Sequence, residues 1–131
     1  MGKKTDYDLA VKILSLVGDL KNLMDDIIDN LYTFRIQEQP TDQNVATSGD
    51  TVTFTVIATG VKSYEWQYRT GDSGSSPGPW RAIFSAATGA DTNSVSFPSN
   101  STRAAYGYRC KMTDYDNVAH FTNKVNFTIG S

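Results

Sequence analysis

The chain has 131 residues, with 12 basic and 14 acidic side chains, a formal net charge of −2, 39% apolar residues, one cysteine and one histidine. This length suits one ordinary domain plus a short extra element, and the balanced charge argues against a nucleic-acid-binding face. A single cysteine excludes an intrachain disulfide and a cysteine zinc cluster, and no apolar run reaches the roughly 18 residues of a membrane span.

The first third of the chain predicts a long helix. Residues 6–34 contain no proline, and their apolar residues recur at alternating steps of four and three, which is the heptad spacing of a coiled coil. Positions a and d of this heptad are Leu9, Ile13, Leu16, Leu20, Leu23 and Ile27. A third apolar column at the e positions consists of Ala10, Val17, Met24 and Leu31.

This apolar stripe is wider than the seam of a two-stranded coil. The opposite side of the helix is polar and carries Gly18, Lys21, Asn22, Asp25 and Asp29. A face of this width predicts that the helix associates with copies of itself in a bundle of three or more, with a trimer favoured. Two alternatives stay open, namely a helix that packs on its own sheet and a helix that docks into a different protein.

From Phe34 onward the segments become short, alternating and β-branched, with turn residues every 8–12 positions. This texture is typical of an antiparallel β-sandwich, so we expect a helix over 1–33 and a β-domain over 34–131. Residues 70–79, rich in glycine, serine and proline, predict a long flexible loop. The expected strands are Phe34–Gln39, Asn44–Thr47, Thr51–Ala58, Ser63–Arg69, Trp80–Phe84, Ser94–Phe97, Tyr106–Thr113 and Ala119–Ile129.

Four residues predict the core of this sandwich. Trp66 lies on the expected third long strand, Tyr108 and Cys110 lie two apart on a later one, and Val56 precedes Trp66 by ten positions. With the segment 80–83 (Trp-Arg-Ala-Ile), they resemble the immunoglobulin-like (I-set-like) modules of bacterial surface proteins and phage virion proteins, over roughly residues 34–130. The resemblance implies an immunoglobulin-like sandwich in which the indole packs between two sheets. Since Val56 replaces the family's partner cysteine, Cys110 is expected to be a buried, unreactive thiol.

No catalytic or metal-binding constellation can be assembled from the remaining residues. The carboxylates of residues 114–117 fit a solvated turn better than a calcium loop, and His120 has no second ligand beside it. We therefore expect no enzyme activity, no metal and no cofactor. The domain has more aromatic side chains than its core can hold, and those expected to be partly exposed and available to a sugar or a partner are Trp80, Phe84, Tyr115 and Phe121.

Helix and resemblance together imply a non-enzymatic phage virion protein of the capsid-fibre, decoration or tail-fibre type. It would oligomerise through its helix and present its domain to a host-surface glycan or another virion protein. The expected location is the virion, because lysis releases such a protein without a secretory signal. The alternative is a carbohydrate-binding module of a secreted bacterial protein, located at the cell surface within a larger chain. A third possibility is an intracellular assembly protein whose helix docks into a different partner.

Overall fold

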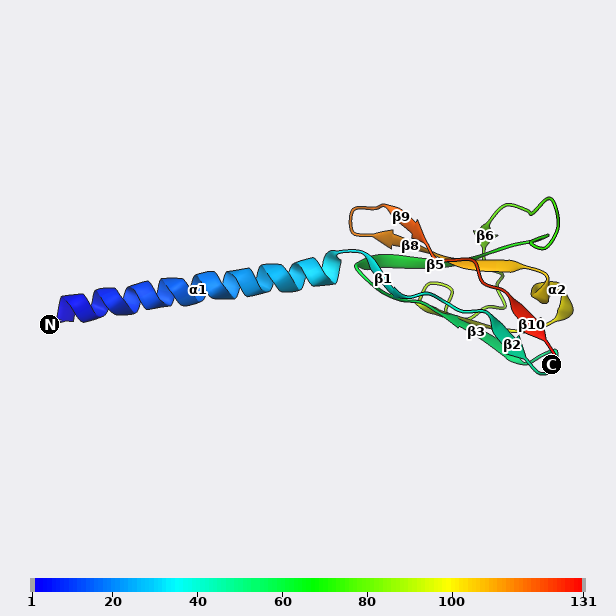
Figure 1. Ribbon diagram of the computed structural model, residues 1–131, viewed down its shortest axis with the longest axis horizontal. Helices are drawn as coiled ribbons and strands as arrows, with labels where there is room; N and C mark the ends of the chain where they lie inside the picture. The colour runs from blue at the N-terminus through cyan, green and yellow to red at the C-terminus, as the bar shows by residue number, and fades with distance from the viewer. Residues whose placement is uncertain (1, 131) are drawn as a thin grey trace.

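The computed structural model describes the backbone of residues 2–130 and the side chains of residues 9–26 and 32–130. One long helix, α1 (Gly2–Tyr32), projects from one end of a β-rich domain (Figure 1). Its 31 residues span roughly 46 Å at about 1.5 Å per residue. The domain consists of β1 (Arg35–Glu38), β2 (Gln43–Val45), β3 (Thr51–Thr55), β4 (Ile57–Thr59), β5 (Val61–Arg69), β6 (Arg81–Ala82), β7 (Ser94–Pro98), α2 (Ser101–Ala104), β8 (Gly107–Asp114), β9 (Ala119–Phe121) and β10 (Phe127–Ile129).

The strands pair in four ladders. The largest has the order β6-β5-β8-β9, and the others pair β3 with β7, β1 with β4, and β2 with β10. All are antiparallel except β2 with β10, which run parallel. The expectation of a wholly antiparallel sandwich is therefore wrong at this edge. The two strands come from opposite ends of the domain sequence, so no hairpin forces them to run antiparallel.

Two expected strands are each divided in the structure. The segment Thr51–Ala58 forms β3, which pairs with β7, and then β4, which pairs with β1. The change of partner falls at buried Val56, whose N–H donates to the carbonyl of Asn93 at 2.9 Å. The segment Ala119–Ile129 likewise divides into β9 and β10. The expected strand Trp80–Phe84 shortens to the two residues of β6, and α2 was not expected.

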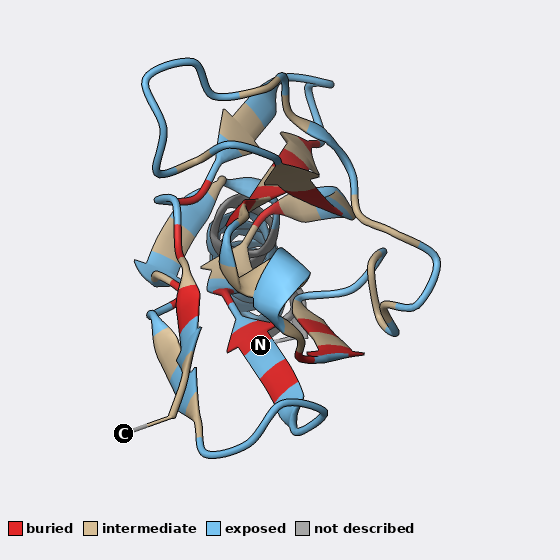
Figure 2. Cartoon of the chain, turned by 90° about the vertical axis from the view of Figure 1, so that its right-hand side faces the viewer, coloured by how far each residue is buried: buried red, intermediate tan, exposed pale blue. Residues whose placement is uncertain are grey.

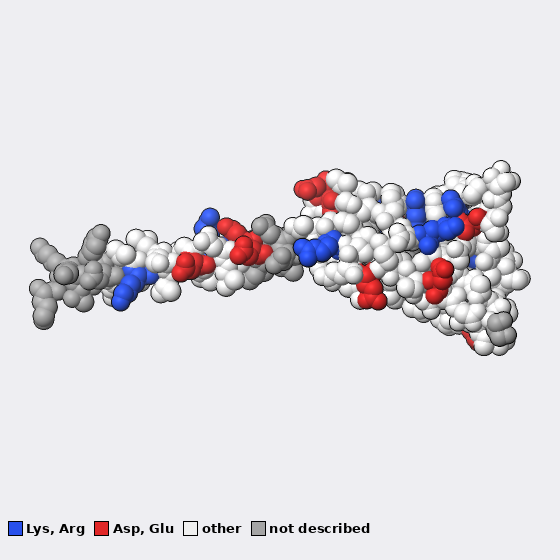
Figure 3. Space-filling model, viewed as in Figure 1, with Lys and Arg blue, Asp and Glu red and all other residues white. Residues whose placement is uncertain are grey.

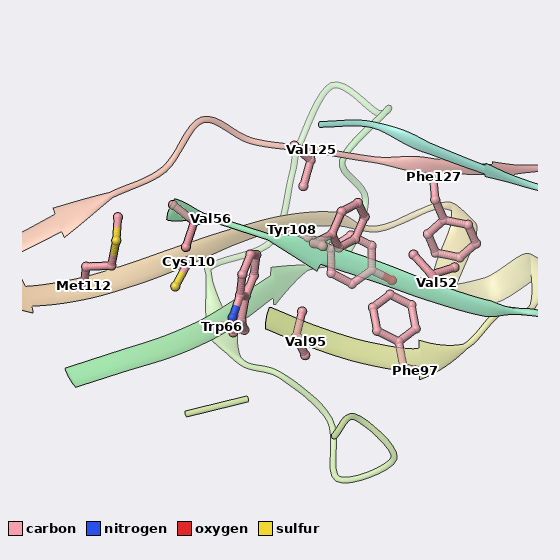
Figure 4. Packing of buried hydrophobic residues seen from close by; sticks show 11 residues of the cluster. Val52, Val56, Trp66, Val95, Phe97, Tyr108, Cys110, Met112, Val125 and Phe127 are labelled. Atoms are coloured by element: carbon pink, nitrogen blue, oxygen red, sulfur yellow. The ribbon is translucent and has the colours of Figure 1, made fainter. Parts of the chain in front are cut away.

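Burial alternates along β3, β7 and β8, so each of these strands has one buried face (Figure 2). The buried faces of β3 and β7 pack against those of β5 and β8. The Phe54 ring centroid lies 6.4 Å from that of Trp66 and 5.4 Å from that of Tyr108, and all three side chains are inaccessible to solvent. The buried hydrophobic core consists of Val52, Phe54, Val56, Trp66, Val95, Phe97, Tyr108, Cys110, Met112, Val125 and Phe127 (Figure 4).

The polar atoms of this core have partners. The Trp66 indole N–H donates to the carbonyl of Thr92 at 2.8 Å, and the Tyr108 hydroxyl donates to the carbonyl of Arg103 at 2.7 Å. Cys110 lies opposite Trp66 in the β5–β8 ladder, with Val56 pointing toward it (Figure 4). Burial raises the pKa of the Cys110 thiol to about 12. All four residues expected in the core are buried.

Replacing Tyr108 by Phe removes the hydroxyl and leaves the Arg103 carbonyl with the Tyr106 N–H, at 3.1 Å, as its remaining donor. We expect Tyr108→Phe to lower the free energy of unfolding by about 1–2 kcal/mol, measured by urea denaturation. The matched control is Tyr64→Phe, because the Tyr64 hydroxyl makes no hydrogen bond within the described residues. The control should change stability by less than about 0.5 kcal/mol. Equal losses in the two variants would contradict the role of this hydrogen bond.

The high pKa of Cys110 predicts a thiol that is inert while the domain is folded, because the thiolate is the reactive form. At pH 8 the native protein should react with a disulfide reagent at least about 100-fold more slowly than the urea-unfolded chain. Absorbance of the released thiol measures both rates. A native rate equal to the unfolded rate would show that solvent reaches Cys110.

Candidate functional site

The helix α1 is exposed along its described length. All side chains of residues 9–26 are exposed. The apolar ones are between 46% and 71% accessible: Leu9, Val11, Ile13, Leu14, Leu16, Val17, Leu20, Leu23 and Met24. Ile27 and Leu31, the other two residues expected to mediate oligomerisation, lie outside the described side chains. The alternative in which this helix packs on its own sheet is therefore wrong for this structure.

The predicted heptad interface does not include two exposed apolar residues of the helix. Val11 and Leu14 fall at f and b, outside the a, d and e columns, and Leu14 is 71% accessible. Charged side chains interrupt the apolar surface of the described helix (Figure 3), and one ion pair joins Lys21 Nζ to Asp25 Oδ2 at 3.7 Å. The helix thus exposes an apolar surface of the kind on which other chains pack.

The helix meets the domain through two aromatic contacts with the β8–β9 hairpin. Tyr32, the last residue of α1, packs edge-on against Tyr115 with ring centroids 4.6 Å apart. Phe34 stacks on the imidazole of His120 with centroids 3.8 Å apart and planes 8° from parallel. Gly60 has a positive φ of 69°, and a Cβ there would collide with the backbone of Thr33. The joint between helix and domain thus consists of two ring contacts and the close approach of Gly60 to Thr33, and Tyr115, which is 49% accessible, belongs to it.

Asp114 organises the hairpin that receives these rings. Its Oδ1 accepts the N–H groups of Asp116 and Val118, and its Oδ2 lies 2.8 Å from His120 Nε2. The hydrogen bond from His120, followed by those from the backbone, lowers the pKa of the Asp114 carboxyl. Its oxygens are thus occupied by the turn itself. Within the described residues, no group of three or more His, Cys, Asp or Glu side chains is placed to hold a metal ion.

The four exposed-aromatic candidates do not form one site. Tyr115 lies at the joint, whereas Phe84 packs edge-on against Tyr68 and Phe97, at centroid distances of 5.5 and 5.2 Å. Phe84 is also covered by the Arg103 guanidinium at 4.4 Å. A hollow of about 330 Å³ beside it is lined by Tyr68, Phe84, Asn100, Thr102, Arg103 and Tyr106. A second hollow of about 560 Å³ is lined by Ser48, Ser101, Ala104, Phe127, Thr128 and Ile129.

Trp80 and Phe121 are brought together by a residue that the sequence analysis did not single out. The guanidinium carbon of Arg109 lies 4.3 Å from the Trp80 ring centroid and 3.9 Å from that of Phe121. Arg109 lies on the outward face of β8, because its neighbours Tyr108 and Cys110 point into the core. We call Trp80, Arg109 and Phe121 the stacked row. Phe121 is 44% accessible, and Trp80 and Arg109 are half-buried.

The loop of residues 70–79 is anchored beside this row by Asp72. One carboxylate oxygen accepts a hydrogen bond from Arg69 Nε at 2.8 Å, and the other lies 3.0 Å from Lys124 Nζ and 2.9 Å from Asn126 Nδ2. Burial alone would raise the pKa of the Asp72 carboxyl, but the hydrogen bonds from Asn126, Lys124 and Arg69 hold it below its ordinary value. The loop is thus tied to β5 and to the segment before β10.

Asp72→Asn should destabilise the domain, because Arg69 and Lys124 lose their shared carboxylate. We expect a loss of about 1–3 kcal/mol near pH 7, measured by urea denaturation. A lowered carboxyl pKa stabilises the fold above the unfolded value near 4, and this contribution is lost as the pH falls through the folded pKa. The difference between wild type and variant should therefore narrow below about pH 4.

The control for this prediction is Asp91→Asn, since Asp91 is exposed and makes no side-chain hydrogen bond among the described residues. The Asp91→Asn variant should be as stable as wild type at pH 7 and at pH 3. A loss of stability in Asp72→Asn that stays constant from pH 7 to pH 3 would contradict the assignment to the Asp72 charge.

No family model matches the chain, and a search of curated proteins finds no significant match. Among the described residues, no helix is both long enough and apolar enough to cross a membrane. The features that a function must explain are therefore physical ones: the exposed apolar helix, its joint with the domain, and the stacked row on the outer sheet face.

Proposed function

We propose that this chain is a non-enzymatic display protein that assembles through α1 and holds its β-domain away from the assembly axis. The exposed apolar face of α1 carries this proposal. Its partner is a second and a third copy of the same helix, because the a, d and e columns repeat with the period at which identical helices cover one another. The Tyr32 and Phe34 contacts then hold each domain at the end of the bundle.

The third helix is inferred from the width of the face. Ile13 at a with Leu16 at d is by itself an arrangement that favours two-stranded parallel coils, so the argument for a third helix depends on the e column. Two strands would leave the e column at the margin of the seam, where Val17 and Met24 would stay partly in water. Both side chains are more than half accessible in the single chain. A three-helix bundle covers this column as well, so a trimer is favoured.

The immunoglobulin-like assignment of the domain is part of the same proposal. It is supported by Trp66 lying opposite Cys110 in the β5–β8 ladder and by the Tyr108 hydroxyl bonding a carbonyl five residues upstream. A tyrosine tied back to upstream backbone in this way is a hallmark of such sandwiches. Domains of this kind resemble modules of phage virion proteins, so we place the assembly on a virion, as a capsid-fibre, decoration or tail-fibre component.

Solution mass tests the assembly. Light scattering on the full chain should give three times the mass of one chain. Leu16→Ser together with Leu23→Ser removes two buried d-position contacts from each chain and should cost about 2–5 kcal/mol per site. The variant should therefore be monomeric, and its circular dichroism should show lost helix, because an isolated helix in water is marginal.

Leu14→Ser is the matched control, because Leu14 and Leu16 are almost equally exposed in the single chain, at 71% and 67%. Leu14 lies at b, outside the predicted interface, so this variant should keep the wild-type mass. A monomeric wild-type chain would overturn the proposal. Equal dissociation by both substitutions would contradict the heptad assignment, and a dimeric wild type would contradict the third helix.

A further inference from the structure

The outer face of the four-stranded sheet holds the stacked row in a defined geometry. Arg109 lies opposite Gln67, and Phe121 lies opposite Lys111, in the registers of β5, β8 and β9. The Arg109 Nε donates to Gln67 Oε1 at 2.8 Å, and the Gln67 amide donates to Glu65 at 2.7 Å. Since Gln67 is buried, it fixes the guanidinium plane between the two rings.

The charge of Arg109 is not neutralised within the described part of the chain. No carboxylate lies within ion-pair distance of it there, and its terminal guanidinium nitrogens have no acceptor among those residues. Arg69 lies 4.9 Å from the Trp80 centroid; burial, together with the charge of Arg69, lowers the pKa of Arg109. By contrast, Asp72 pairs with Arg69 and Lys124. Arg109 therefore has no ion-pair partner among the described residues, and the same holds for Lys111, two residues along β8.

A ligand of the stacked row should carry one anionic group and one flat apolar face. A planar guanidinium with free terminal N–H groups matches a carboxylate in two parallel hydrogen bonds. The exposed ring of Phe121 beside it offers an aromatic face on which the C–H groups of a sugar ring can pack. A nucleic acid fits less well, because base stacking needs an open aromatic face and the Trp80 ring is already covered by the Arg69 and Arg109 guanidinium groups.

We propose that the stacked row binds a carboxylated sugar, with the uronate group on Arg109 and the pyranose ring on Phe121. All of these residues belong to one chain. The site therefore goes beyond the proposed display function and does not depend on the assembly of α1. Binding per chain should be the same in the wild type and in the Leu16→Ser, Leu23→Ser variant, so failure of either proposal is recognised separately.

The test is a titration of the full-length protein with tetragalacturonic acid. Trp80 is the reporter of fluorescence, because the only other tryptophan, Trp66, is fully buried. Calorimetry gives an independent dissociation constant. The methyl-esterified tetrasaccharide is the matched ligand control, since it keeps the sugar rings and loses the charge. We expect saturable binding of the acid, at least about tenfold weaker binding of the ester, and weakening of the acid's affinity by added salt.

Arg109→Met and Arg103→Met are the matched protein variants, because each removes one guanidinium that lies over an aromatic ring. Arg109 lies over Trp80 and Phe121, and Arg103 lies over Phe84. Only Arg109→Met should lose binding, by about tenfold or more. Should that variant fail to fold, Arg109→Lys keeps the charge without the planar fork and should bind about threefold to tenfold more weakly.

Three results would overturn the proposal. One is the absence of saturable binding of the acid by the wild-type chain, and another is equal affinity for acid and ester. The third is unchanged affinity in Arg109→Met or, if that variant does not fold, in Arg109→Lys. A titration in which single-stranded oligothymidylate binds at Trp80 and the acid sugar does not would likewise overturn it and identify a nucleic-acid surface instead.

Discussion

Aromatic packing between two strand ladders holds the domain together, and the exposed surfaces take their positions from it. Phe54 on β3 packs on Trp66 of β5 and Tyr108 of β8, and none of the three rings is accessible to solvent. Because side chains alternate along a strand, inward Tyr108 and Cys110 force Arg109 outward between Trp80 and Phe121. The buried face of the sheet thus determines the chemistry of the exposed one.

The helix obeys a different constraint, since its described side chains, residues 9–26 and Tyr32, are all exposed. Burial of apolar area is the main favourable contribution to folding, and a helix whose leucines stay in water lacks this contribution. The described helix nevertheless repeats a heptad that would bury these side chains among identical copies. The domain needs no such help, because its core is closed and its described buried side-chain N and O atoms all have hydrogen-bond partners. If the proposed assembly forms, stability comes from two sources, the core within each chain and the helix contacts between chains.

Local pattern predicted the long helix, most strands and the buried positions of Val56, Trp66, Tyr108 and Cys110. It failed where the outcome depends on partners distant in sequence. The break at Val56 arises because β3 and β4 pair with different strands, and the parallel pairing of β10 with β2 joins segments more than 80 residues apart. Of the four aromatics expected to be partly exposed, Tyr115 and Phe121 are exposed, whereas Trp80 and Phe84 are half-buried. The role of Arg109 was not predicted, since its place between Trp80 and Phe121 depends on the register of three strands. Asp72 was missed because its partners Lys124 and Asn126 lie far along the chain.

The short joint between helix and domain has a geometric consequence. Only Thr33 and Phe34 separate the end of α1 from the start of β1. The Tyr32–Tyr115 and Phe34–His120 contacts restrict the movement of the helix relative to the domain. An α-helix turns by about 100° and rises about 1.5 Å per residue. Inserting one residue near the end of α1 would therefore rotate the domain through about 100° around the helix axis while displacing it by only about 1.5 Å. In the bundle that we propose, the length of the helix, counted in single residues, would determine which side of each domain faces outward.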